Sequence, residues 1–280
     1  MSDQPTPLPP RPNKMPFAAD LLAGSIVLIS GAGGGLGGAT ARLAGKLGAR
    51  VVLVGRTETK LDAVRADIEA AGGKAVCRSV DVRNRAEVDA LYAWLGDTLG
   101  PPDILVNSAG GQFPQAAIDY SEKGWNAVIN TNLNGTFHMM QAAARLWRDT
   151  KHPGSIVNVV VEPRGLHGVA HTLAARSAVI AFSNAVSVEW GPLGIRVNCV
   201  APGLVRTDGW KVYSPEAVAS YMRCNPLMNV GSAEEIAEAC IYVGSPAASY
   251  MTGAVITIDG GSQHWGEIWT TGKPDYFRNP

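Results

Sequence analysis

The chain has 280 residues, with 24 Lys and Arg against 24 Asp and Glu, so its formal net charge is zero. Such a chain has no basic excess to hold a nucleic acid or an acidic membrane surface, and we expect neither as a partner. Hydrophobic residues make up 46% of the chain, which excludes a disordered protein. Because no apolar run is long enough for a membrane span or a secretory signal, we expect a cytoplasmic protein.

From residue 25 onward, short β-branched runs alternate with longer helical stretches. The runs are apolar throughout, which is typical of strands covered on both faces of a parallel sheet. Expected strands are residues 25–30, 50–55, 74–80, 103–107, 155–161, 195–201 and 254–259; expected helices are residues 36–48, 59–71, 85–99, 124–148, 172–190 and 233–243. The pattern predicts an α/β, doubly wound Rossmann-type fold: a seven-stranded parallel sheet with helices on both faces, in one domain.

The single domain is expected to span residues 20–262, between two tails. Proline-rich residues 1–19 are predicted to be disordered, and the aromatic residues 263–280 to dock on a neighbouring subunit. Within the domain, residues 204–230 follow the sixth expected strand, where we expect a substrate lid. Its apolar side chains either line a pocket for a lipophilic substrate or merely pack the lid down. They include Trp210, Tyr213, Tyr221 and Met222.

A glycine-rich turn, SGAGGGLG, joins the first expected strand to the first helix. Gly31, Gly35 and Gly37 have GxxxGxG spacing. Glycine lets the backbone approach a pyrophosphate closely, and the helix N-terminus behind it presents unpaired N–H groups. A tight turn also needs glycine for steric reasons alone, but the position between strand and helix favours a dinucleotide site.

Arg56 follows the second expected strand, where a Rossmann-type fold meets the adenosine ribose. An acidic residue there would bind a free 2′-hydroxyl, whereas arginine can hold a 2′-phosphate. We therefore expect NADP(H) to be preferred over NAD(H). The alternative is a solvated surface arginine.

Further motifs follow in order: Asp81-Val82, NSAG at 107–110, NTNLNGTF at 130–137, and Pro202-Gly203 with Thr207. With the glycine turn, they resemble the short-chain dehydrogenase/reductase superfamily over residues 25–262. The resemblance implies an adenine contact at Asp81-Val82 and a nicotinamide contact in the run that begins at Pro202. The full set of expected cofactor contacts is Gly31, Gly34, Gly35, Leu36, Gly37, Arg56, Asp81, Val82, Asn107, Ala109, Gly110, Arg176, Pro202, Gly203, Val205 and Thr207.

The catalytic part of that pattern is broken. Most of the superfamily has a serine after the fifth strand, but that position falls here on Val161 or Glu162. HTLAAR stands where YxxxK is expected, so Thr172 and Arg176 replace the tyrosine and the lysine, and only the helix asparagine, Asn132, is kept. Threonine cannot titrate near neutrality and arginine cannot release its proton there. Alcohol oxidation and ketone reduction should therefore suffer most.

Reduction of a carbon–carbon double bond conjugated to a thioester makes a different demand. Negative charge develops on the thioester oxygen, so oriented hydrogen-bond donors become the main requirement. The Thr172 hydroxyl is a candidate donor, and His171 precedes it, although neighbouring helical residues point about 100° apart. The expected catalytic residues are Asn132, Thr172, Arg176 and His171.

Within the superfamily, the chain is most similar to peroxisomal trans-2-enoyl-CoA and 2,4-dienoyl-CoA reductases. The shared segments are GGQF at 110–113, residues 123–137, residues 154–161 and HTLAAR. The resemblance implies an NADP(H)-dependent reductase of an enoyl thioester or similar lipophilic substrate. Two alternatives stay open: a carbonyl reductase or alcohol dehydrogenase with another proton donor, such as His171, His167 or Tyr213, and a catalytically silent cofactor-binding homologue.

A homotetramer is also expected from the resemblance, because the superfamily commonly pairs the helix at residues 172–190 across a dimer interface. In this chain that helix has a face of small residues, which permits close packing. They are Ala174, Ala178, Ala181 and Ala185.

Overall fold

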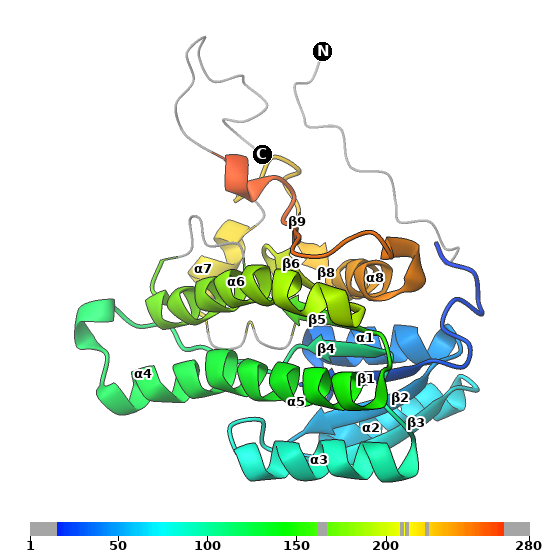
Figure 1. Ribbon diagram of the computed structural model, residues 1–280. Coiled ribbons are helices and arrows are strands. Elements are labelled where there is room, and N and C mark those ends of the chain that lie inside the picture. Colours follow the sequence, from blue (N-terminus) through cyan, green and yellow to red (C-terminus); the bar gives the residue numbers. More distant parts are fainter. Residues whose placement is uncertain (1–15, 162–166, 208–209, 211–212, 222–223, 266–280) are drawn as a thin grey trace, which may run out of the picture.

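A seven-stranded parallel sheet forms the centre of the computed structural model, with helices on both faces (Figure 1). The structure describes residues 16–161, 167–207, 210, 213–221 and 224–265. The strand order is β3-β2-β1-β4-β5-β6-β9, and every pairing is parallel. This confirms the predicted fold class. The strands are β1 (Ile26–Ser30), β2 (Arg50–Gly55), β3 (Lys74–Ser79), β4 (Ile104–Asn107), β5 (Gly154–Val159), β6 (Ile195–Pro202) and β9 (Val255–Ile258).

Successive side chains of each central strand pack alternately into two hydrophobic cores, one on each face of the sheet. In β1, Val27 and Ile29 pack in the core on one face, and Leu28 packs in the core on the other. Successive strand residues point to opposite faces, so a strand buried on both sides must be apolar at every position. This explains why the strands read as continuous apolar runs.

Each face of the sheet carries its own helical layer (Figure 1). Helices that contact one another in the first layer are α1 (Gly35–Lys46), α2 (Glu58–Ala70) and α8 (Ala233–Gly244). The second layer consists of α3 (Arg85–Thr98), α4 (Glu122–Ile129), α5 (Gly135–Thr150) and α6 (Ala170–Trp190). The expected helices lie within about two residues of these, with one exception.

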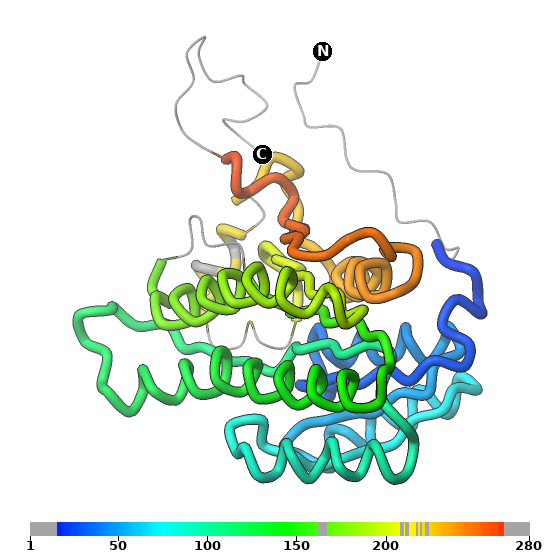
Figure 2. Tube along the Cα trace, in the orientation of Figure 1, coloured from blue at the N-terminus to red at the C-terminus, as the bar shows by residue number. Residues whose placement is uncertain are grey.

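The exception is the helix expected at residues 124–148. Helices α4 and α5 form a nearly continuous coil (Figure 2), but a π-helical turn, Asn130–Asn134, separates them. Such a turn inserts one extra residue into a helix and is frequent at functional sites. The side-chain hydroxyl of Thr136 donates to the Asn132 carbonyl at 2.9 Å, which satisfies one backbone acceptor in the widened turn.

The expected lid has a small sheet at its base. Strand β7 (Val205–Arg206) pairs in parallel with β8 (Gly231–Ser232), and α7 (Pro215–Ser220) lies between them in the chain. Met222, the expected N-terminal tail at residues 1–15, and the expected C-terminal tail at residues 266–280 lie outside the described residues. Within the described residues, no helix is long and apolar enough to cross a membrane.

Candidate active site

The glycine-rich turn lies between β1 and α1, at the carboxyl edge of the sheet. Gly31 has φ +73°, and a Cβ there would lie 2.6 Å from the Ala109 backbone nitrogen, so the two loops pack directly. A Cβ at Gly34 or Gly35 would meet no atom within 4 Å. No side chain caps α1, and its first turn has no acidic residue. The N-terminus of α1 therefore borders open space at Gly34 and Gly35 and suits a phosphate of a dinucleotide, whereas Leu36 packs on the core and Gly37 packs against the Gly31 carbonyl oxygen.

The buried side chain of Asn107 connects the ends of neighbouring strands at this edge of the sheet. Its side chain accepts a hydrogen bond from Ser30 Oγ at 3.3 Å and donates to Asn158 Oδ1 at 2.9 Å, which ties the ends of β1, β4 and β5 together. Asn158 in turn donates to Ser183 Oγ on α6 at 2.9 Å. Because Asn107 is 1% exposed, it shapes the cofactor edge by holding the strand ends. Asn158 and Ser183 were not foreseen from the sequence.

The loop after β6 packs on the end of β9. The Gly203 amide donates to the Ile258 carbonyl at 2.9 Å, and a Cβ at Gly203 would lie 2.7 Å from Asp259 Cα. Pro202 ends β6, Val205 begins β7, and the Thr207 carbonyl accepts from the Trp210 amide at 3.2 Å. The predicted nicotinamide-contacting run therefore leads directly into the lid.

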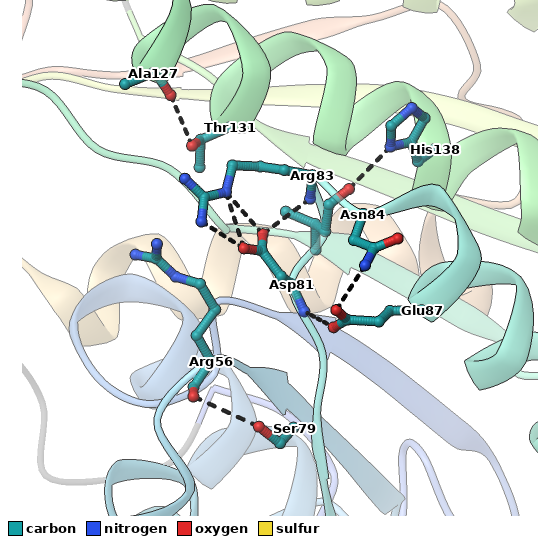
Figure 3. A network of polar contacts seen from close by, with 10 residues as sticks. Arg56, Ser79, Asp81, Arg83, Asn84, Glu87, Ala127, Thr131 and His138 are labelled. Atoms are coloured by element: carbon teal, nitrogen blue, oxygen red, sulfur yellow. Dashed lines mark hydrogen bonds and ion pairs between the residues drawn. The ribbon is translucent and has the colours of Figure 1, made fainter. Parts of the chain in front are cut away.

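Arg56 and Asp81 follow the neighbouring strands β2 and β3 (Figure 3). Arg56 is exposed, and its guanidinium makes no hydrogen bond or ion pair with any described side chain. Asp81 pairs with Arg83, whose hydrogen bonds lower the pKa of the Asp81 carboxyl. Beside them, His138 Nδ1 lies 3.0 Å from the Val82 carbonyl oxygen.

Asn132 and Thr172 meet at the catalytic end. The Asn132 Nδ2 atom donates to Thr172 Oγ1 at 2.8 Å and to the Gly111 carbonyl at 3.0 Å, while Asn132 Oδ1 accepts from the Gly111 amide at 3.0 Å. Three hydrogen bonds, one with Thr172 and two with Gly111, thus hold the Asn132 side chain, which the π-helical turn carries. Because Thr172 Oγ1 accepts from Asn132, its own proton is oriented away from that amide and is available to another acceptor.

Arg176 lies one helical turn after Thr172 on the same face of α6. Its Nη1 donates to the Val159 carbonyl at 2.8 Å and its Nη2 to the Ala109 carbonyl at 3.3 Å. A Cβ at Gly110 would lie 1.9 Å from Arg176 Nη2, so any larger residue there would force the guanidinium to shift. Burial lowers the pKa of Arg176 to about 10, and the group is still charged at neutral pH. It supplies a fixed positive charge beside Ala109 and Gly110.

His171 faces away from this polar pair, into an aromatic cluster. Its ring stacks on Tyr120, with centroids 4.6 Å apart and an interplanar angle of 8°, and meets the Phe113 ring edge-on at 4.5 Å. The Thr172 amide donates to His171 Nδ1 at 2.8 Å. Burial lowers the pKa of His171, so its neutral form is favoured. His171 therefore lies among aromatic rings, and its expected role toward substrate stays a prediction.

The lid closes on the loop after β4. Trp210 and Tyr221 pack edge-on with centroids 5.1 Å apart, and Tyr213 packs on Tyr221 at 6.0 Å. Gln112 Nε2 donates a hydrogen bond to the Tyr213 hydroxyl oxygen, and the Gln112 neighbour Gly111 holds Asn132. The lid is therefore joined to Asn132 through two adjacent residues. Sequence reasoning did not assign Gln112 a role.

At the expected serine position, the structure describes Val161, whereas Glu162 lies outside the described residues. His167 is described and exposed. Of the basic side chains that the sequence offers for a CoA phosphate, Arg206 is described and exposed, while Arg164, Lys211 and Arg223 lie outside the described residues.

Residues 31–263 match the family model described as enoyl-(acyl carrier protein) reductase. The chain belongs to the short-chain dehydrogenase/reductase family. Similar relatives include a Bacillus subtilis protein named "Probable 2,4-dienoyl-CoA reductase", 36% identical over 84% of this chain and 95% of its own length. Another is a Chlamydia muridarum 3-oxoacyl-[acyl-carrier-protein] reductase, FabG, which is 34% identical over 86% of this chain and 98% of its own length.

The fold is also shared with solved structures of this family. An Agrobacterium tumefaciens dehydrogenase, whose crystal structure has bound NADP, is 29% identical, with a TM-score of 0.81. The alignment covers 89% of this chain and 100% of that one. Membership therefore establishes an oxidoreductase family that uses nicotinamide dinucleotides.

Proposed function

We propose that this protein is an NADP(H)-dependent reductase that reduces the carbon–carbon double bond of an enoyl thioester. The observation that carries the proposal is the Asn132–Thr172 hydrogen bond, which orients a non-titrating hydroxyl where most of the family has tyrosine. The similarity to a protein named as a 2,4-dienoyl-CoA reductase supports the same substrate class.

The chemistry of enoyl reduction suits these residues. NADPH supplies a hydride to the β-carbon of the enoyl group when it is bound, and the electron pair of the double bond moves toward the thioester oxygen. Thr172 donates its proton in a hydrogen bond to that oxygen, and Asn132 holds the hydroxyl in place. The fixed charge of Arg176 stabilises negative charge nearby. The α-carbon then takes a proton from water, so no side chain has to release one.

The cofactor preference rests on Arg56. Its guanidinium pairs with no described side chain and follows the carboxyl end of β2, the strand beside β1, and such a fork suits a phosphate. An Arg56→Asp variant should bind NADPH about 10- to 100-fold more weakly and bind NADH unchanged or more tightly, because the carboxylate repels the 2′-phosphate and accepts from a free 2′-hydroxyl. Cofactor titrations by fluorescence measure both constants. An unchanged NADPH-to-NADH ratio would refute the 2′-phosphate role.

The reaction is tested by following NADPH absorbance with a trans-2-enoyl-CoA and with a panel of ketones. Consumption with the enoyl thioester is expected. Consumption only with ketones would instead support the carbonyl-reductase alternative, which the similarity to FabG favours.

The burial of Asn132 and Thr172 motivates a third outcome, a catalytically silent homologue. Asn132 is fully buried and Thr172 is 1% exposed, so a substrate oxygen reaches the hydroxyl only if the covering segments separate. A catalytically silent homologue would bind NADPH, detected as a rise in melting temperature, and would consume none with either substrate.

We also propose a homotetramer through the exposed small residues of α6, which sedimentation at several concentrations would test.

A further inference from the structure

Asp81, the expected adenine contact, is already occupied by a neighbour. Arg83 Nε lies 2.9 Å from Asp81 Oδ1 and 3.0 Å from Oδ2, Arg83 Nη2 also donates to Oδ2, and the Arg83 amide donates to Oδ1 at 3.0 Å. A carboxylate has about four lone-pair sites. Three N–H groups of one residue, of which the Nε–H is shared between both oxygens, leave little capacity for an adenine amino group.

The second carboxylate of this region is occupied too. Glu87 Oε2 accepts from the Asp81 amide at 2.7 Å, and Glu87 Oε1 accepts from Asn84 Nδ2 at 2.8 Å. Asn84 caps α3 through its bond with the Ala86 amide. The segment from Asp81 to Glu87 is therefore a self-contained network that fixes where Arg83 lies (Figure 3).

The guanidinium groups of Arg56 and Arg83, in contrast, have N–H groups that donate to no described acceptor. Figure 3 shows the Arg56 side chain reaching toward the Asp81–Arg83 pair, and this positive charge contributes to lowering the pKa of Asp81. Arg83 Nη1 donates to no acceptor among the described residues, and the Arg83 side chain is 39% exposed. Two guanidinium groups, each with N–H groups that bind no described acceptor, thus flank one carboxylate that is already paired.

We propose that Arg83 is a second determinant of cofactor choice, which neutralises Asp81 and presents its free N–H groups to the 2′-phosphate beside Arg56. The inference rests on the proposed NADP(H) preference and adds a residue to it. Without Arg83, the Asp81 carboxylate would be unpaired close to a dianionic phosphate. Arg83 therefore acts both by attraction and by cancelling a repulsion, which distinguishes it from an ordinary surface arginine.

This double role gives a characteristic pattern in a double-mutant cycle. Arg83→Gln should weaken NADPH binding about tenfold and leave NADH binding within about twofold, because only NADPH has the 2′-phosphate. Asp81→Asn should leave the ratio of the NADH and NADPH dissociation constants unchanged or raise it. The double variant should recover the part of the lost preference that is due to the unpaired carboxylate, and not the part that is due to the lost attraction. Arg148→Gln, which removes another surface Arg–Asp pair, is the matched control.

The probes are NADPH and NADH, with 2′,5′-ADP and 5′-AMP as fragments that contain no nicotinamide. Arg83→Lys, which keeps the charge and loses the fork, should fall between wild type and Arg83→Gln, and melting temperatures without ligand identify any variant that fails to fold. Equal weakening of NADPH and NADH by Arg83→Gln, or no recovery in the double variant, overturns the inference. If Arg56→Asp alone shifts the preference, the proposed NADP(H) use stands without Arg83. If wild type prefers neither cofactor nor fragment, both proposals fail.

Discussion

Replacing Thr172 by valine tests the proposed oxyanion donor with almost no change in shape. Thr172 is 1% exposed, and valine has the same branched outline, so the change removes one hydroxyl and creates no large cavity. Removing a single donor of this kind typically lowers kcat about 10²- to 10³-fold. We expect a loss of that size with trans-2-enoyl-CoA, and an NADPH dissociation constant within about twofold of wild type.

The same change has a structural cost that can be estimated separately. Asn132 Nδ2 would lose the acceptor at 2.8 Å and keep the Gly111 carbonyl at 3.0 Å, which leaves one buried N–H unpaired. Such a loss costs about 1–3 kcal/mol of folding free energy. For a domain of this size that corresponds to a melting temperature lower by about 2–10 °C.

The assay combines initial rates of NADPH oxidation at saturating thioester with melting curves. Thr172→Ser is the matched control, because it keeps the hydroxyl and loses only a methyl group; it should retain most of the activity. If Thr172→Val kept activity within about threefold of wild type while binding NADPH normally, the hydroxyl would not be the donor. The proposed mechanism would then be wrong at its central step.

Two further outcomes are expected. Burial lowers the pKa of His171 below its ordinary value near 6.5. As the pH falls below about 6.5, His171 therefore becomes protonated in the unfolded chain before it does in the folded one, and the free energy of unfolding decreases. In urea unfolding between pH 7.5 and 5, His171→Gln should show a smaller decrease, and an equal one would contradict the burial argument. Gly37→Ala places a Cβ against the Gly31 carbonyl oxygen and should abolish the NADPH-induced thermal shift. Gly111→Ala, whose Cβ would meet no atom within 4 Å, should keep that shift; similar shifts in both variants would remove the glycine turn from the cofactor site.

The sheet could be predicted from the sequence because its signal is local and repeated. Strands buried on both faces must be apolar at each position, as at Val27, Leu28 and Ile29, and their boundaries were expected within about two residues. The π-helical turn could not be predicted, because Asn130–Asn134 contains no glycine or proline that would exclude an ordinary helix. Only the hydrogen bonds around Asn132 distinguish the two.

The polar site was predictable only in part, because some of its contacts join residues that are far apart in the sequence. Thr172 and Asn132 were expected from a family pattern, and the structure brings them together. The surroundings of His171 come from Phe113 and Tyr120, far away in sequence, so no pattern near position 171 indicated an aromatic cluster. Asp81 and Arg83, in contrast, are only two residues apart in the sequence. The family resemblance implied an adenine contact at Asp81 and gave no indication of its pairing with Arg83.

The π-helical turn makes the length of one helix part of the chemistry. Deleting a single residue from Asn130–Asn134 would leave a regular helix with better hydrogen-bond geometry, but would rotate α4 by about 100° relative to α5. Asn132 would lose its alignment with Gly111, and Trp125 on α4 would swing away from Tyr120. The deletion would therefore give a more regular helix and disrupt the site. The irregular turn places the side-chain amide of Asn132.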